Sequence, residues 1–223
     1  MNHEKSEWTA VTDIMDKNEI ILGRYLAYWF EKTPRRALYY ATYYKFASKL
    51  IGKNRRVLDV GCSEGMGTWL LAAECGYAKG IDLDEAAINI AQQNWQAEKI
   101  TFACEDFLNI QAEPWDAVVS FDVIEHILPA NCDSFFTGIT GNLTHDGIVI
   151  LGTPSLEGQQ YASVVSKAGH VNVYSYERLE EEMYKYFDHV FVFCANDEII
   201  HTGFPRMAHY LIAVGCKKKK MER

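Results

Sequence analysis

The chain has 223 residues, of which 48% are hydrophobic, and its formal net charge at pH 7 is -8. This length and composition can bury one good core, so we expect a single domain with a modest extension. The acidic balance disfavours binding along a nucleic-acid backbone and favours a small neutral or cationic substrate. No stretch is apolar for the roughly 18 residues that a bilayer span needs, and the start lacks a signal-peptide pattern. We therefore expect a cytoplasmic protein without a membrane span.

Residues 1–51 are predicted to form an N-terminal helical extension that is rich in Tyr, Trp and Phe. Two helices are expected, about Ile14 to Glu31 and about Pro34 to Ile51, with Thr33 as N-cap and Pro34 at the first helical position. We interpret them as a lid. Four tyrosines of the second helix recur at helical spacing. For them, packing on the sheet is favoured over stacking on a flat substrate. These are Tyr39, Tyr40, Tyr43 and Tyr44.

The chain from Arg56 onwards contains seven apolar runs that read as strands: RVLDVG, YAKGID, ITFACED, WDAVVSFD, GIVILGTP, HVFVFCA and AHYLIAVGC. Up to Thr153 the connections are long enough to hold helices, which predicts a mainly parallel sheet covered on both faces. The last two runs are joined too closely for a crossover, so the last strand should be antiparallel. We expect an α/β fold with a Rossmann-like, doubly wound, seven-stranded sheet. This domain should span residues 52–216, and residues 217–223 should form a solvated basic tail.

A glycine-rich turn follows the first strand, in RVLDVGCSEGMGTWLLA (residues 56–72). Its pattern of Asp59, Gly61, Ser63, Gly65 and Gly67 differs from the G-x-G-x-x-G of dinucleotide sites and lacks the lysine of a P-loop. A carboxylate before the first glycine would repel a phosphate and attract a cation. The turn therefore favours a cationic ligand over a phosphate.

This stretch resembles the first motif of class I S-adenosylmethionine (SAM)-dependent methyltransferases, which usually reads near VLDVGCGTG. Ser63 replaces the middle glycine of that motif. SAM has no phosphate and carries both an ammonium and a sulfonium. The resemblance is strong over about residues 56–152, and it implies SAM binding by Asp59, Gly61, Ser63 and Gly65.

The resemblance also implies cofactor contacts at the ends of the next strands. Asp82 would accept hydrogen bonds from the ribose hydroxyls, with Leu83 beside it, and Asp106 would meet the adenine amino group while Phe107 flanks the ring. Phe121, at the end of the fourth strand, is a further expected contact. Each carboxylate alone could simply cap a loop, but three of them, Asp59, Asp82 and Asp106, at successive strands of a doubly wound sheet favour a ligand site.

The segment SFDVIEHILP, after the fourth strand, carries Asp122, Glu125 and His126 at i, i+3 and i+4. A single helical turn would aim all three in one direction. The segment resembles the VIEH stretch of the ubiquinone-biosynthesis O-methyltransferases and, more distantly, the acidic-x-x-Glu-His motif of small-RNA 3'-end methyltransferases. The resemblance implies a divalent metal held by Asp122, Glu125 and His126, with His170 as the second histidine. Such mixed ligands suit Mg, Mn, Fe or Zn.

Two other interpretations of this segment stay open. His126 could act directly as a general base, oriented by Glu125 or Asp122, without a metal. Glu125 could instead be a structural anchor for the loop. The residues expected to carry catalysis are His126, Glu125 and His170.

The sequence thus predicts an enzyme that moves the SAM methyl group to a hydroxyl oxygen of a small molecule, such as a quinone-like phenol, a sugar or a natural product. One alternative is an RNA 3'-end or other nucleic-acid methyltransferase, which fits poorly with the net charge of -8. Another is a non-catalytic SAM-binding module, which would not need the Glu-His set. The sequence determines neither the acceptor nor the oligomeric state.

Overall fold

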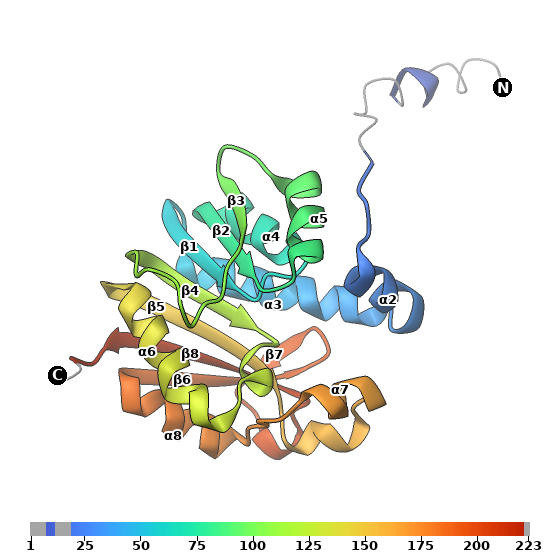
Figure 1. The fold of residues 1–223 in the computed structure, drawn as a ribbon. Helices are drawn as coiled ribbons and strands as arrows, with labels where there is room; N and C mark the ends of the chain where they lie inside the picture. The colour runs from blue at the N-terminus through green and yellow to red at the C-terminus, as the bar shows by residue number, and fades with distance from the viewer. Residues whose placement is uncertain (1–7, 12–18, 221–223) are drawn as a thin grey trace.

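The computed structural model describes residues 8–11 and 19–220, and it contains one eight-stranded sheet flanked by helices (Figure 1). The strand order is β3-β2-β1-β4-β5-β8-β6-β7. The strands are β1 Arg55–Val60, β2 Gly76–Asp82, β3 Ile100–Cys104, β4 Trp115–Phe121, β5 Leu143–Pro154, β6 Phe187–Asn196, β7 Ile199–His201 and β8 Tyr210–Lys218. Strands β1 to β5 pair in parallel, and β8 is antiparallel to both β5 and β6. The predicted fold class is confirmed.

The sheet has one strand more than the seven that were predicted, and the additional strand is β7. It pairs antiparallel with β6, and Asp197 lies in the left-handed region at φ 51° between them. Aspartate tolerates that conformation better than most residues, which permits the tight turn. A strand of three residues has too short an apolar pattern to be distinguished from a loop.

Helices cover both faces of the sheet. One buried cluster includes Tyr44, Leu71 and Ile88 on one face, and another includes Phe136 and Leu179 on the other. Successive residues of a strand point to opposite faces, which is why β1 contributes to both clusters. The helices are α2 Arg24–Lys32, α3 Arg35–Ile51, α4 Met66–Cys75, α5 Glu85–Trp95, α6 Cys132–Asn142, α7 Val164–Gly169 and α8 Tyr176–Tyr186.

The first predicted helix is shorter than expected. Of the range 14–31, residues 14–18 lie outside the described residues, and residues 19–23 are not helical, so α2 begins at Arg24. Gly23, the residue before α2, has an extended backbone, so the helix cannot continue through it toward the N-terminus. Helix α3 begins one residue after the predicted start, with Pro34 at the N-cap.

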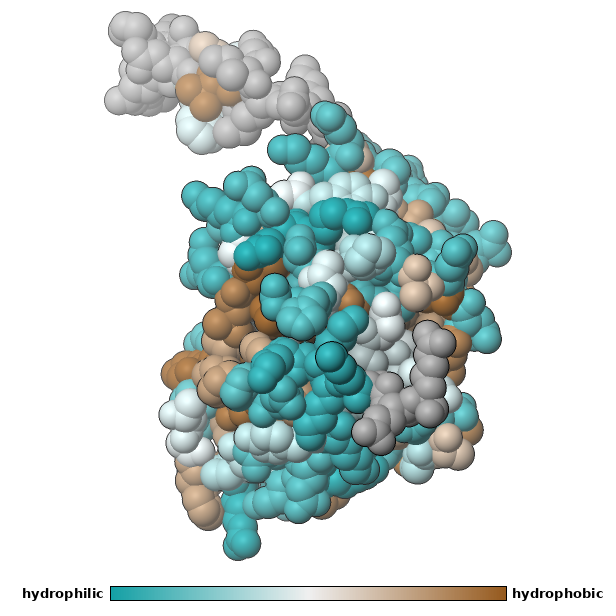
Figure 2. Space-filling view, turned by 90° about the vertical axis from the view of Figure 1, so that its left-hand side faces the viewer, coloured by the Kyte–Doolittle hydropathy of each residue, from teal (hydrophilic) through white to brown (hydrophobic). Residues whose placement is uncertain are grey.

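Helix α3 packs into the domain core. Tyr43 and Tyr44 are buried in the same cluster as the strands, which confirms packing as the role of these tyrosines. The 51/52 domain boundary stays a prediction, and α3 shares its core with the chain that follows. Figure 2 shows one face of the molecule, on which hydrophilic side chains predominate and hydrophobic ones appear in separate patches.

The prediction of a solvated basic tail over residues 217–223 is wrong for its first two residues, because Lys217 and Lys218 belong to β8. The Lys218 ammonium donates hydrogen bonds to the carbonyls of Thr140 and Leu143, at 2.8 and 2.5 Å, where helix α6 ends. The side chain therefore satisfies carbonyls that the helix leaves unpaired. In the part of the chain that the structure describes, no helix has the length and apolar character needed to cross a bilayer.

Candidate functional site

The glycine-rich turn forms a tight connection between β1 and α4. Gly61, Ser63 and Gly65 all have positive φ, at 78°, 49° and 80°. A Cβ at Gly65 would lie 2.7 Å from Phe102, so glycine is also required there by space. Ser63 adopts a conformation that is free of strain only for glycine, which agrees with its replacing a glycine in this motif. Its expected contact with the cofactor stays a prediction.

Asp82, at the end of β2, is bound to this turn. Its Oδ2 accepts a hydrogen bond from the Ser63 amide at 2.8 Å, and its Oδ1 accepts one from the Asp84 amide at 3.0 Å. A carboxylate has about four acceptor positions, so capacity remains for two ribose hydroxyls. Leu83, the next residue, is 71% exposed at the same edge of the sheet. The structure thus brings two predicted cofactor residues, Ser63 and Asp82, into contact.

Asp59 is enclosed, and does not lie at an open mouth as its place before Gly61 suggested. The side chain points to the α3/α4 face, where it accepts hydrogen bonds from Tyr44 Oη at 3.2 Å and Thr68 Oγ1 at 2.6 Å. Burial raises the pKa of the Asp59 carboxyl to about 7, although both hydroxyls favour its charged form. A direct electrostatic role toward the cofactor therefore stays a prediction.

The two residues predicted to contact adenine differ in position: Asp106 lies in the turn after β3, and Phe107 lies in the core. Asp106 accepts hydrogen bonds from the Leu108 amide and from Asn109 Nδ2, so it organises the turn after β3. Phe107 is buried and packs edge-to-face on Phe135, with ring centroids 5.4 Å apart. Its expected contact with adenine stays a prediction beside this packing role.

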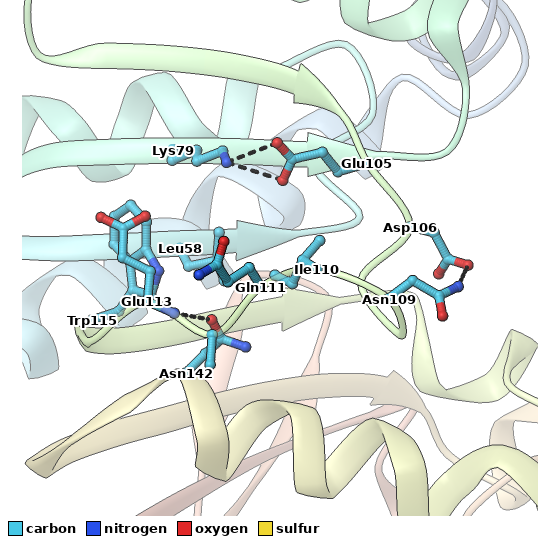
Figure 3. A pocket seen from close by; sticks show the side chains of 11 residues that line it. Leu58, Lys79, Glu105, Asp106, Asn109, Ile110, Gln111, Glu113, Trp115 and Asn142 are labelled. Carbon is cyan, nitrogen blue, oxygen red and sulfur yellow. Dashed lines mark hydrogen bonds and ion pairs between the residues drawn. The ribbon is translucent and has the colours of Figure 1, made fainter.

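A cavity of about 530 Å³ opens next to Asp106, beneath the loop between β3 and β4 (Figure 3). Lys79 and Glu105 are paired in it at 3.0 Å, and Leu58 and Trp115 form part of its wall. The glycine-rich turn does not line this cavity. The cavity therefore extends along the sheet face away from that turn.

The segment after β4 turns sharply at Asp122, whose φ is 57°. Its Oδ2 accepts a hydrogen bond from Arg36 of α3 at 3.1 Å, while its Oδ1 is buried without a partner. The predicted helical turn is a short 3-10 turn over Ile124–His126 that excludes Asp122. Phe121, just before it, is buried and lies edge-to-face on Tyr44 at 4.9 Å, so its cofactor contact stays a prediction.

Glu125 is fully buried beside β5. Its Oε2 accepts a hydrogen bond from Thr153 Oγ1 at 3.0 Å, and its Oε1 has no partner. Burial raises the pKa of this carboxyl to about 8, and the neighbouring Asp122 raises it further. The Asn172 amide donates to the Glu125 carbonyl at 3.0 Å, which ties this turn to the segment after α7. Glu125 thus has one oxygen held and one unpaired.

His126 and His170 meet across the site, although 44 positions separate them in the sequence. Their ring centroids are 5.1 Å apart, and single ligand atoms of Glu125, His126 and His170 all lie within 4.8 Å of one another. Asp122 is not a member of that group. Burial lowers the pKa of His170, and His126 lowers it further.

Further residues complete this site beyond those that the sequence suggested. In the part of the chain that is described, the buried side-chain polar atoms without a partner are Asp122 Oδ1, Glu125 Oε1, Gln159 Nε2 and Tyr210 Oη. Burial raises the pKa of Tyr210 well above its usual value, and Asp122 and Glu125 add to the effect, so the phenol lies near both carboxylates. Buried polar groups are normally paired, and an unpaired set favours a polar ligand. No sequence motif marks Gln159 or Tyr210, because Gln159 lies in the segment after β5 and Tyr210 begins β8, far apart in the chain.

Comparisons with known proteins agree with this architecture. Residues 51–199 match the family model described as a methyltransferase domain. The N-methyltransferase NodS from Bradyrhizobium japonicum WM9, solved with S-adenosyl-L-homocysteine (SAH), superposes with a TM-score of 0.61 at 20% identity, covering 84% of this chain and 90% of that one. The chain belongs to the methyltransferase domain family, as a class I SAM-dependent methyltransferase.

Curated relatives differ in their reactions. The cyclopropane-fatty-acyl-phospholipid synthase of Escherichia coli (strain K12) is 24% identical over 163 residues, which cover 69% of this chain and 42% of the relative. A ubiquinone biosynthesis O-methyltransferase of Glaesserella parasuis serovar 5 (strain SH0165) is 26% identical over 131 residues, covering 55% of this chain and 54% of the relative. The chain thus spans about half the length of these relatives.

Proposed function

We propose that this methyltransferase transfers the SAM methyl group to an oxygen of a small-molecule acceptor bound beside Glu125, His126 and His170. The observation that carries the proposal is the convergence of these three side chains, with ligand atoms within 4.8 Å of one another. The cofactor would lie on the glycine-rich turn, with its ribose on Asp82. This edge of the sheet is where doubly wound folds bind ligands.

Hydrogen bonds to the two imidazoles define the tautomer of each neutral ring. The Gly169 carbonyl can only accept, so His126 Nδ1 donates to it at 2.8 Å, which leaves Nε2 of the neutral ring with a free lone pair. His170 Nδ1 lies 3.1 Å from Gln159 Oε1 and donates in the same way. Histidine ligands of metals typically donate their other ring N–H to an oxygen in this manner.

The same three residues fit a divalent metal ion. Glu125 Oε1 is buried and unpaired, which suits a cation ligand, and the combination of one carboxylate and two imidazoles suits Zn, Mn or Fe. Such an ion, when bound, would lower the pKa of an acceptor hydroxyl. In its absence, His126 is the group that can take the hydroxyl proton directly. Methyl transfer itself depends mainly on alignment of the acceptor with the sulfonium.

Calorimetric titration of Mg, Mn and Zn into chelator-stripped, SAH-saturated protein tests the metal. We expect saturable binding that is lost in His126→Ala and in His170→Ala and retained in His145→Ala, since the His145 side chain is exposed near the start of β5. Binding that survives in both site variants, or no binding by the parent, would exclude the metal part of the proposal.

The acceptor class is tested separately, by transfer of labelled methyl from SAM to a catechol, an isolated phenol and an aliphatic amine. We expect the catechol to be methylated, because both of its neighbouring oxygens could bind a divalent ion held by Glu125, His126 and His170. Transfer to the amine alone would contradict an oxygen acceptor, whatever the metal result.

A further inference from the structure

The glycine-rich turn also holds the first lid helix, α2. Glu64 lies in the turn and is only 2% exposed. Its Oε1 accepts a hydrogen bond from the Tyr25 amide and its Oε2 accepts one from the Leu26 amide, both at 2.8 Å. These amides belong to the first turn of α2, where helix N–H groups lack intrahelical partners. Glu64 therefore takes the place of an N-cap side chain from 38 positions further along the chain.

Gly23 makes this approach possible. It is the N-cap residue of α2, and it has an ordinary φ of -77° that any residue can adopt. A Cβ at this position would collide with Glu64 Oε1. Glycine is thus required here by the space that Glu64 occupies and not by the backbone conformation.

The same segment is bound on the other side to the loop after β2. Tyr25 Oη donates a hydrogen bond to Asp84 Oδ2 at 3.1 Å, and the Asp84 amide in turn donates to Asp82. Ile21 exchanges two backbone hydrogen bonds with the Asn94 side chain of α5, at 3.0 and 2.8 Å. Residues 21–26 therefore span from the glycine-rich turn to Asp84, in the loop that follows Asp82 at the end of β2.

These contacts differ in how firmly they are held. Trp95 Nε1 donates to the Glu64 carbonyl at 3.0 Å, so the turn itself is fixed to α5. Helix α2 buries only Leu26, and Tyr25 is 41% exposed. An element with so little buried apolar surface opens at a low free-energy cost. Opening of this region should therefore separate α2 from Glu64 and leave the turn in place.

We propose that Glu64 is a positioning residue of the cofactor site, which caps α2 and so holds Tyr25 across the bound cofactor. SAM and SAH then enter and leave when the contact between Glu64 and α2 opens. This inference rests on the proposed location of the cofactor on the glycine-rich turn. Glu64 acts through α2 and is not itself assigned a contact with the cofactor.

SAH dissociation from the full chain, followed by stopped-flow tryptophan fluorescence, tests the proposal. We expect Glu64→Ala to raise the dissociation rate about ten-fold, which corresponds to the roughly 1.4 kcal/mol of a typical capping interaction. Hydrogen exchange of the Tyr25 and Leu26 amides should accelerate in the same variant. Glu64→Gln keeps one acceptor oxygen and should restore part of the effect. The matched control is Glu74→Ala, which removes an exposed carboxylate of α4 paired with Lys49.

A second variant disrupts the contact between Glu64 and α2 by a change at the N-cap of the helix. Gly23→Ala should accelerate SAH dissociation in the parent, because the new methyl group displaces Glu64 from α2. In the Glu64→Ala background the same change should have little effect, because the group that it collides with is gone. Additive effects of the two substitutions would overturn the proposal.

The failures can be distinguished. If the parent does not bind SAH, the proposed cofactor site is wrong and this inference falls with it. If the parent binds SAH and folded Glu64→Ala releases it at the parental rate, the cofactor site stands and the role of Glu64 is wrong.

Discussion

Three carboxylates buried in the described part of the chain differ in how their oxygens are paired. Asp59 accepts from two hydroxyls, Glu64 accepts from two backbone amides, and Glu125 accepts from one hydroxyl and leaves one oxygen unpaired. The unpaired oxygen lies in the proposed acceptor site, whereas the paired carboxylates hold the glycine-rich turn and its surroundings. Pairing thus separates the carboxylate available to a ligand from those with structural roles.

Asp59 predicts a pH dependence of stability. Its pKa is raised to about 7 in the folded protein, against about 3.9 in an unfolded chain. The folded state therefore binds more protons between these values, and the parent loses stability as pH rises from about 4 to about 7. An amide side chain cannot titrate, so the free energy of unfolding of Asp59→Asn should not fall in this way. Relative to the parent, it should rise by about 1 to 4 kcal/mol between pH 5 and pH 8. Urea unfolding at both pH values measures this, with Asp146→Asn as exposed control. An equal difference at the two pH values would contradict it.

At the scale of elements, the close packing of α3 on α4 fixes the N-terminal helical segment to the domain. Gly67, in the first turn of α4, faces the ring of Tyr44, and a Cβ there would collide with that ring. Tyr44 in turn donates to Asp59 and lies on Phe121. One glycine therefore determines how α3 sits above the end of β1.

Gly67→Ala should destabilise the protein by about 1 to 3 kcal/mol, because the methyl group overpacks the contact between α3 and α4. Gly141, near the end of α6, has open space around it, so Gly141→Ala should instead stabilise by about 0.5 to 1 kcal/mol through helix propensity. Denaturant unfolding of the two variants gives the comparison. Destabilisation of similar size in both would show that close packing is not the cause.

At the scale of the whole molecule, the strand order reverses between β1 and β4, since β2 and β3 lie on one side of β1 and β4 and β5 on the other. Such a reversal opens a crevice at the carboxyl ends of the strands, where ligands of this architecture bind. The glycine-rich turn follows β1 and the Asp122 to His126 segment follows β4, so the proposed cofactor and acceptor sites adjoin.

SAH should therefore stabilise the entire domain. At 100 times its dissociation constant, we expect a gain of about 2.7 kcal/mol, measured as a rise in Tm. In Asp82→Ala the affinity should fall about ten-fold or more, because hydrogen bonds to a charged group are lost. Asp146→Ala, at an exposed position, should behave as the parent. The parental shift in Asp82→Ala would exclude a ribose contact at this residue.

The sequence by itself determined the features that depend on neighbouring residues. Strand periodicity, the glycine-rich turn and the strand-end position of Asp82 all follow from local patterns, so the mainly parallel sheet and the class of enzyme were predictable. The strand β7 was not predictable because three residues give too short an apolar pattern. The start of α2 and the pairing of Lys218 were not predictable because each depends on partners elsewhere in the chain.

Only the tertiary structure decided which distant groups meet. His170 reaches Glu125 and His126 through the segment after β5, and Glu64 meets α2 across 38 positions. The enclosure of Asp59 likewise depends on Tyr44, from a helix that precedes it. The physical reason is that burial requires each polar group to find a partner, and packing of the whole chain determines which partner lies within reach.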